Sequence, residues 1–328
     1  MSDNLVPTAT FTHVHNGDIT LRLAHVGTGP LVLMVHGFPE AWFSWRHQMK
    51  ALADAGYTAA AFDTRGYGGS SKPAPVEAYT MAEMTGDICA VIDALSDGPA
   101  VLIGHDWGAP QVYSTALIHP DKVRAVVGLS VPAPPYSDKV PDEFWPDEPG
   151  KPVFYRHLLT KPGTEKILDA NPEEFLRRFY YALSGLRPDS VNGLVRPAGT
   201  RNLVAGIPDV SPVGPWLSEE ELAAYVQSFA GGFRGGLNRY RAAPLDRDTL
   251  SQHREKMITQ PALFIGGGRD PIRTILGTGD RYADPLARCT DPRGAHIIER
   301  AGHWLQQEAP DEVNALLLAF LSGLDDPR

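Results

Sequence analysis

The nine residues V-L-I-G-H-D-W-G-A, numbered 101–109, determine how the rest of the chain is interpreted. Three apolar residues lead into Gly104 and Gly108 follows closely, so a short buried strand passes at once into a G-x-D-x-G sequence. This pattern predicts a sharp strand-to-helix turn that raises its central side chain, here Asp106, above the end of a sheet. The glycines let the backbone fold back without a Cβ in the way. A carboxylate in this position can attack a saturated carbon and form an ester, which water must then hydrolyse.

The composition limits the class of protein. The 328 residues are 43% hydrophobic and 21% charged, which is typical of a globular protein. The net charge of -9 argues against nucleic acid or an anionic membrane surface as a partner. The two cysteines, Cys89 and Cys289, provide no disulfide framework and indicate a reducing, cytoplasmic compartment. No signal peptide is recognisable at the first residues, and no apolar run is long enough to span a membrane.

Strands and helices are expected to alternate along the first 130 residues or so. The sequence predicts a hairpin over 11–26, strands over 31–35, 58–62 and 123–129, and helices over 45–55, 81–95 and 110–118. This alternation predicts an α/β fold with a mostly parallel, doubly wound sheet. Sites on such sheets lie beyond the carboxyl ends of the strands. His36, Asp63 and Asp106 are all expected at that edge.

The sequence changes character after Val131. Prolines cluster up to residue 152, and helical patterns over 173–183 and 219–230 follow without a buried strand between them. Strand patterns return at 261–266 and 296–298, and a helix is predicted over 310–321. We therefore expect a core built from residues 1–132 and 249–328, with residues 133–248 inserted as a helical cap. Such a cap would close a water-poor pocket above Asp106.

Two further residues complete a possible catalytic triad. Asp270 follows the strand pattern A-L-F-I-G-G-G-R, and His303 stands in A-G-H-W before the last helix. The chain order nucleophile, acid, histidine is typical of this arrangement. His303 would take a proton from water, and Asp270 would orient its ring. Taken singly, an Asp after a strand is usually a turn former, and a His beside Trp304 usually packs. The order of all three residues favours the triad.

The turn His36-Gly37-Phe38-Pro39 is expected to face Asp106. The backbone N–H groups of Phe38 and Trp107 could converge on one oxyanion. In this chemistry the oxyanion forms on Asp106 itself, when water adds to the ester. A purely structural turn is the alternative interpretation. Supporting roles around the nucleophile are expected for His36, Gly37, Pro39, His105 and Trp304.

Four segments carry a resemblance to a known family. They are H-G-F-P-E-A-W-F-S-W-R from residue 36, D-T-R-G-Y-G-G-S-S from residue 63, G-H-D-W-G-A from residue 104 and A-G-H-W from residue 301. Together they resemble the soluble epoxide hydrolases of the α/β-hydrolase superfamily, from about residue 11 to the last helix. The resemblance implies an α/β-hydrolase fold and the conversion of an epoxide and water to a vicinal diol. This reaction requires no metal and no organic cofactor, and the protein would be a monomer or a homodimer.

The resemblance also implies two cap tyrosines that bind the epoxide oxygen. The segment F-Y-R-H-L-L-T-K-P-G from residue 154 maps this role onto Tyr155, and G-G-F-R-G-G-L-N-R-Y-R from residue 231 maps it onto Tyr240. The first match departs from the family's Phe-Gln at residues 159–160, so Tyr180 and Tyr181 stay open as alternatives to Tyr155. A phenol remains protonated at neutral pH and can donate to a developing alkoxide. Simple packing is the usual role of a single tyrosine.

Four other functions compete with epoxide hydrolysis. A haloalkane dehalogenase would use the same triad, but that family has Asn at the position of Phe38. A haloacid dehalogenase acting on fluoroacetate has Arg at the position of Trp107. Asp106 itself disfavours an esterase. A non-catalytic binding protein of the same fold would be expected to have lost a triad residue, and none is missing.

Overall fold

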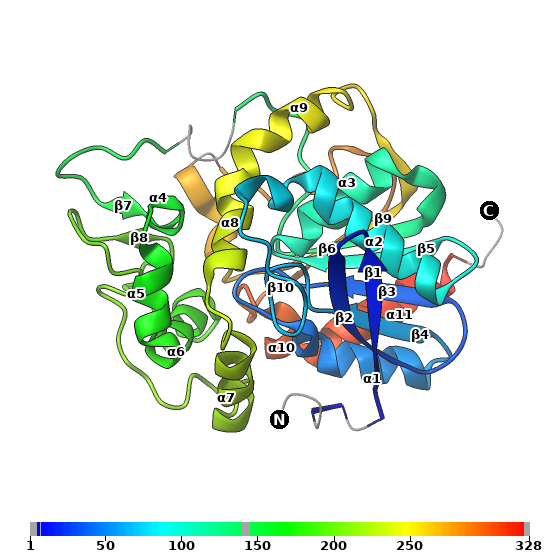
Figure 1. Ribbon diagram of the computed structural model, residues 1–328, viewed down its shortest axis with the longest axis horizontal. Coiled ribbons are helices and arrows are strands. Elements are labelled where there is room, and N and C mark those ends of the chain that lie inside the picture. Colours follow the sequence, from blue (N-terminus) through cyan, green and yellow to red (C-terminus); the bar gives the residue numbers. More distant parts are fainter. Residues whose placement is uncertain (1–4, 7, 140–144, 278, 325–328) are drawn as a thin grey trace.

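An eight-stranded sheet forms the centre of the protein, whose computed structural model describes residues 5–6, 8–139, 145–277 and 279–324 (Figure 1). The spatial order is β1-β2-β4-β3-β5-β6-β9-β10. β2 is antiparallel to its neighbours β1 and β4. The remaining neighbours, in the spatial order β4-β3-β5-β6-β9-β10, pair in parallel. The predicted doubly wound α/β-hydrolase sheet is therefore confirmed. The strands are β1 (Thr10–Asn16), β2 (Ile19–Val26), β3 (Leu31–Val35), β4 (Thr58–Phe62), β5 (Ala100–His105), β6 (Val123–Leu129), β9 (Ile258–Gly267) and β10 (Cys289–Ile298).

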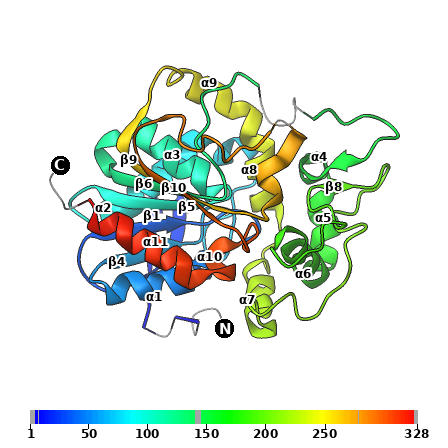
Figure 2. The same cartoon turned by 180° about the vertical axis from the view of Figure 1, so that it is seen from behind.

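Helices cover both faces of the sheet. α1 (Arg46–Asp54) and α11 (Pro310–Ser322) pack together on the face seen in Figure 2. α2 (Met81–Leu95) and α3 (Gly108–Ile118) pack on the opposite face. Because successive side chains of a strand point to opposite faces, Met34 of β3 enters the core cluster under α1 and α11, and Leu33 enters the cluster under α2 and α3. This two-sided burial explains why residues 31–35 are apolar throughout.

The segment between β6 and β9 contains mostly helices. α4 to α7 form a group at one side of the sheet, and α8 runs between that group and the sheet (Figures 1 and 2). Two elements that the sequence did not predict, β7 (Val153–Phe154) and β8 (Val195–Arg196), pair there as a small antiparallel sheet. The helices are α4 (Tyr155–Thr160), α5 (Thr164–Ala170), α6 (Pro172–Leu183), α7 (Glu219–Ser228), α8 (Arg234–Ala242) and α9 (Asp246–Ser251). Residue 248, where we expected the cap to end, lies inside α9.

The last strand begins earlier than the sequence indicates. β10 pairs with β9 from Cys289 onward, whereas only residues 296–298 were predicted. β10 lies at the edge of the sheet and most of its side chains are not buried, so its first half carries no apolar signal. The remaining short elements are η2 (Trp42–Trp45), η3 (Val76–Tyr79), η4 (Pro120–Lys122), η6 (Ala243–Leu245), η7 (Pro271–Gly277) and α10 (Leu305–Glu308). Among the described residues, no helix is long and apolar enough to cross a membrane.

Candidate active site

Asp106 occupies the turn between β5 and α3 with a φ of 49°, in the left-handed region that non-glycine residues rarely adopt. The turn that follows β3 comes very close to it. A Cβ added to Gly37 would lie 2.7 Å from the amide nitrogen of Trp107, which is closer than real Cβ contacts allow. Only glycine fits at residue 37, and the bond between Phe38 and Pro39 is cis. The two loops therefore meet at the nucleophile position, as the sequence predicted.

The structure brings Asp106, His303 and Asp270 together. Nε2 of His303 lies 3.4 Å from Oδ2 of Asp106, and its Nδ1 lies 3.1 Å from Oδ2 of Asp270. Asp270 follows β9, and its Oδ1 accepts the Ile272 N–H at 2.8 Å. His303 stands between β10 and α10, and all three residues are buried. The imidazole thus lies between two carboxylates at the carboxyl edge of the sheet.

This position changes the acidity of the imidazole. Burial alone would lower the pKa of His303, but the charge of Asp270 and the interactions with Asp106 outweigh burial and raise the pKa to about 10. The Asp270 carboxyl also feels burial, which would raise its pKa, yet the attraction of His303 holds that pKa below its usual value. In the resting site the imidazole is therefore protonated and the Asp270 carboxyl is ionised.

One of the two expected oxyanion donors already contacts the nucleophile. The Phe38 N–H donates to Oδ1 of Asp106 at 2.9 Å. Trp107 makes no corresponding hydrogen bond to Asp106 in the described part of the chain, although its amide nitrogen lies beside Gly37. Oδ1 is therefore held by the turn, while Oδ2 faces His303.

The residues with expected supporting roles are all buried around the triad. His36 contacts the Gly37 carbonyl through Nδ1 at 2.9 Å and accepts the Thr64 N–H through Nε2 at 3.1 Å. Burial lowers the pKa of His36, so its ring is neutral. The Pro39 carbonyl accepts a hydrogen bond from the Tyr180 hydroxyl at 2.8 Å. The Trp304 ring lies 4.7 Å from the His303 ring, and the His105 Nε2 lies 2.7 Å from the His303 carbonyl.

Tyr155 and Tyr240 come from two helices, α4 and α8, that pack against each other. The Tyr240 ring lies 5.4 Å from the Phe38 ring and 5.3 Å from the Trp107 ring, beside both residues expected to form the oxyanion hole. Gly236 lies one turn before Tyr240, and a Cβ there would lie 2.8 Å from the Phe38 ring. The missing side chain lets α8 approach the core. Tyr180, an alternative to Tyr155, instead directs its hydroxyl to the Pro39 carbonyl.

Comparison with known proteins supports the fold and the family. Residues 30–159 match the family model described as the alpha/beta hydrolase fold. The chain is 40% identical over 319 residues to "Epoxide hydrolase A" of Mycobacterium tuberculosis, covering 95% of this chain and 97% of that protein. "Epoxide hydrolase B" of the same organism is 35% identical, with 90% and 92% covered. The structure resembles an epoxide hydrolase from an endophytic Streptomyces with a TM-score of 0.90 and 41% identity, covering 97% of this chain and 96% of that one.

The chain belongs to the epoxide hydrolases of the α/β hydrolase fold. The resemblance that its motifs carried is therefore confirmed. A second structure, that of Epoxide Hydrolase A from Mycobacterium thermoresistibile, is similar to this chain with a TM-score of 0.87 and 38% identity. The similarity covers 96% of this chain and 99% of that one. These similarities extend over the segment between β6 and β9 as well as over the sheet.

Sequence reasoning missed two residues beside the triad of this epoxide hydrolase. Ser130 directly follows β6 and has a φ of 69°. Its hydroxyl lies 2.7 Å from Nδ1 of His303 and also contacts Oδ2 of Asp270. The Tyr282 hydroxyl lies 2.8 Å from the same Asp270 oxygen. The position of Ser130 at the carboxyl end of a parallel strand was a usable signal, whereas Tyr282 lies in a loop that carries none.

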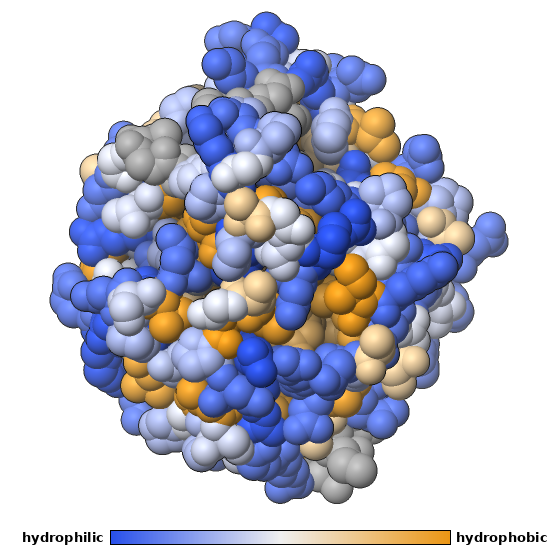
Figure 3. All heavy atoms as spheres, turned by 90° about the vertical axis from the view of Figure 1, so that its left-hand side faces the viewer, coloured by the Kyte–Doolittle hydropathy of each residue, from blue (hydrophilic) through white to orange (hydrophobic). Residues whose placement is uncertain are grey.

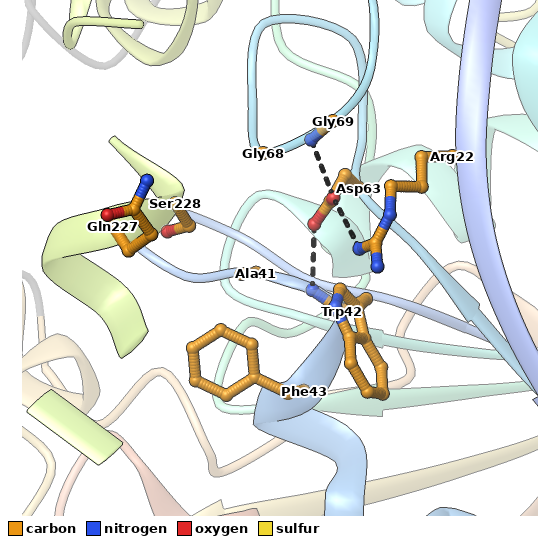
Figure 4. Close-up of a pocket in the computed structure, with 9 residues that line it drawn as sticks. All are labelled: Arg22, Ala41, Trp42, Phe43, Asp63, Gly68, Gly69, Gln227 and Ser228. Carbon is orange, nitrogen blue, oxygen red and sulfur yellow. Dashed lines mark hydrogen bonds and ion pairs between the residues drawn. The ribbon is translucent and has the colours of Figure 1, made fainter. Parts of the chain in front are cut away.

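Asp63 has a structural role apart from the triad. It follows β4, as expected, and its carboxylate accepts the N–H groups of Trp42 at 3.2 Å and Gly69 at 2.9 Å (Figure 4). The guanidinium of Arg22 lies 3.6 Å from it. These groups line a cavity of about 170 Å³ that also borders the end of α7 at Gln227. In this epoxide hydrolase, Asp63 therefore fixes two loops instead of serving the nucleophile.

Proposed function

We propose that the protein hydrolyses an epoxide to a vicinal diol through a covalent ester on Asp106. The observation that carries this proposal is the arrangement of the Asp106 carboxylate, with Oδ1 bound by the Phe38 N–H and Oδ2 3.4 Å from His303. A carboxylate so held is an ester-forming nucleophile, and the imidazole beside it can act as a base once the ester has removed the charge of Asp106. The family membership supports the same reaction, because the relatives named above are epoxide hydrolases.

The first step opens the epoxide. Oδ2 of Asp106 attacks one ring carbon, forming a carbon–oxygen bond as the bond between that carbon and the epoxide oxygen breaks. The released oxygen would be an alkoxide, a poor leaving group unless it receives a proton. Tyr155 and Tyr240 donate to that oxygen. Burial raises the pKa of Tyr240 well above its usual value, and Tyr155 and Asp106 raise it further, so the phenol remains protonated until the alkoxide forms.

The second step hydrolyses the ester. Before hydrolysis, the protonated His303 ring gives its proton through water to the Tyr240 phenolate. The neutral ring, oriented by Asp270, then takes a proton from water, and the resulting hydroxide adds to the ester carbonyl of Asp106. The amides of Phe38 and Trp107 stabilise the oxyanion, and each such donor contributes roughly 3 kcal/mol to catalysis. Collapse of the oxyanion releases the diol and restores the carboxylate. The proton that His303 took from water stays on the ring, which restores the protonated resting state.

The inserted segment is proposed as a cap over this site. We place it at residues 133–248, between the two parts of the core, where it contributes both tyrosines. Its outer surface is mostly hydrophilic, with apolar side chains in separate patches (Figure 3). The proposed partners are a small epoxide and water, in a monomer or homodimer. The two free thiols, Cys89 and Cys289, support the cytoplasm as the compartment.

Trapping the ester tests this function. Replacing His303 with Gln removes the base but leaves Asp106 and the cap tyrosines, so the ester should form and persist. Intact-protein mass spectrometry after incubation with styrene oxide should show a gain of one substrate mass. The matched Asp106→Asn variant should show no gain. No gain in His303→Gln under saturating epoxide would contradict the covalent route, and faster halide release from a haloalkane than diol formation would indicate a dehalogenase.

A further inference from the structure

Arg156 places a positive charge beside the cap tyrosines. It follows Tyr155 directly in the first turn of α4 and is buried. Its guanidinium carbon lies 5.4 Å from the centre of the Tyr240 ring and 5.3 Å from that of Trp107. Both distances are within the range in which a cation is attracted to the face of an aromatic ring. One short helix therefore presents the first cap tyrosine and a cation for the second.

A second guanidinium nearby, that of Arg239, contacts the Trp107 ring. Arg239 lies 4.7 Å from the Trp107 ring, but it forms an ion pair with Asp246 and donates to the Tyr79 carbonyl. Among the ring–cation contacts of the described residues, the contact with Tyr240 is made by Arg156 alone. A change of charge on this phenol therefore acts on Arg156 directly.

The charge on Tyr240 changes during the proposed first step. Burial raises the pKa of the phenol, as do Tyr155, Asp106 and Tyr67, and Arg156 opposes them. A phenol in such surroundings is a poor acid, because the phenolate it leaves behind is desolvated and close to other phenols and a carboxylate. The attraction between Arg156 and a neutral ring is weak, whereas its attraction to a phenolate is a charge–charge interaction. Arg156 therefore stabilises the phenolate more than the phenol.

We propose that Arg156 is a positioning residue for epoxide opening, which assists Tyr240 in giving its proton to the epoxide oxygen. This inference rests on the proposed function, in which Tyr240 is a proton donor. As the Asp106 ester forms, the proton moves from the Tyr240 hydroxyl to the released oxygen, and the negative charge stays on the Tyr240 oxygen, whose ring Arg156 contacts. Ester hydrolysis does not involve this charge, so Arg156 acts on the first step only.

Single-turnover kinetics can separate the two steps. Rapid-quench mass spectrometry measures ester formation and ester decay in the wild type, in Arg156→Met and in Arg156→Lys. Arg178→Met, which removes a cation that contacts Glu174 on α6, is the matched control. We expect Arg156→Met to slow ester formation about tenfold and to leave ester decay unchanged. Arg156→Lys should recover most of the rate, and Arg178→Met should stay within twofold of the wild type.

A double-mutant cycle with Tyr240→Phe identifies the partner through which Arg156 acts. If Arg156 works through the phenol, Arg156→Met adds no further loss once the hydroxyl is gone. A full tenfold loss in the Tyr240→Phe background, or unchanged ester formation in both Arg156 variants, overturns the inference. Equal slowing of ester formation and decay also overturns it, because that result indicates a general structural role. If the wild type itself forms no ester, the proposed function fails first, and the two failures are thereby distinguished.

Discussion

At the scale of single residues, the proposed mechanism lets the charge of Asp106 control the base that later hydrolyses its ester. Burial lowers the pKa of His303, while Asp270 and Asp106 together raise it to about 10. Esterification turns the Asp106 carboxylate into a neutral group and removes one of the two interactions that favour the protonated ring. The pKa of His303 must then fall, since burial is unchanged and only Asp270 still stabilises the charge. The base becomes available only after the first step has occurred.

This reasoning predicts the pH dependence of ester decay. The unprotonated ring is the active form, so the rate of ester decay should rise with pH to a plateau. The midpoint, the pH at half of the plateau rate, should lie below about 10, the resting pKa of His303. Ester decay in single-turnover experiments from about pH 6 to about pH 11 measures this midpoint. In Asp270→Asn the midpoint should move lower still, because the remaining partner of the imidazolium is lost. A wild-type midpoint at or above 10 would contradict the argument.

At the scale of elements, Glu40 joins three loops of the active site. Its Oε2 accepts the Gly37 N–H at 3.0 Å and lies 2.7 Å from Nδ1 of His105, and its Oε1 accepts the Gln306 amide at 2.8 Å. Burial would raise the pKa of Glu40, but the interactions with His105 outweigh it and lower the pKa to about 2. One ionised carboxylate thus connects the turn after β3, the end of β5 and the start of α10.

Replacing Glu40 with Gln should therefore destabilise the fold. The variant removes the buried negative charge beside His105. It also places amide protons against groups that already donate to residue 40, such as the Gly37 N–H and the Gln306 amide. Together these changes should lower the free energy of unfolding by about 3 kcal/mol. Urea unfolding followed by circular dichroism measures this cost. Glu83→Gln is the control, because the Glu83 side chain is 52% exposed and the buried Arg65 that it contacts keeps its ion pair with Asp87, so its loss should cost under about 1 kcal/mol. Equal effects of both substitutions would show that the Glu40 contacts carry little energy.

The sequence predicts those elements whose signal lies in a few neighbouring residues. The apolar run at 31–35, the helical pattern over α2 and the glycines around Asp106 each have a short-range signal, and the structure has them at the predicted positions. Ser130, Tyr282 and Glu40 were missed because each of them has at least one partner far away in the chain. Ser130, for example, meets Asp270 across 140 residues. β7 and β8 were missed because strands of two residues have no periodicity to detect.

At the scale of the whole molecule, α6 is hydrogen-bonded to the core beside the active site. The Tyr180 hydroxyl donates to the Pro39 carbonyl, and the Trp304 indole donates to the Tyr180 carbonyl at 2.8 Å. The His303 N–H donates to the Leu183 carbonyl at 2.9 Å. The two loops that carry Phe38 and His303 are thus each connected to the same helix. We expect the inserted segment and the sheet to unfold together, because their contacts include the catalytic loops.

Tyr180→Phe tests this connection and also the open assignment of the first cap tyrosine. The change leaves the buried Pro39 carbonyl without its donor, which should lower the free energy of unfolding by about 1–3 kcal/mol. Because the Tyr180 hydroxyl is directed at Pro39, ester formation should change less than threefold, whereas Tyr155→Phe should slow it at least tenfold with little change in stability. Tyr57→Phe, at a partly buried position between α1 and β4, is the control for both measurements. If Tyr180→Phe abolishes ester formation while the protein stays folded, the role proposed for Tyr155 belongs to Tyr180.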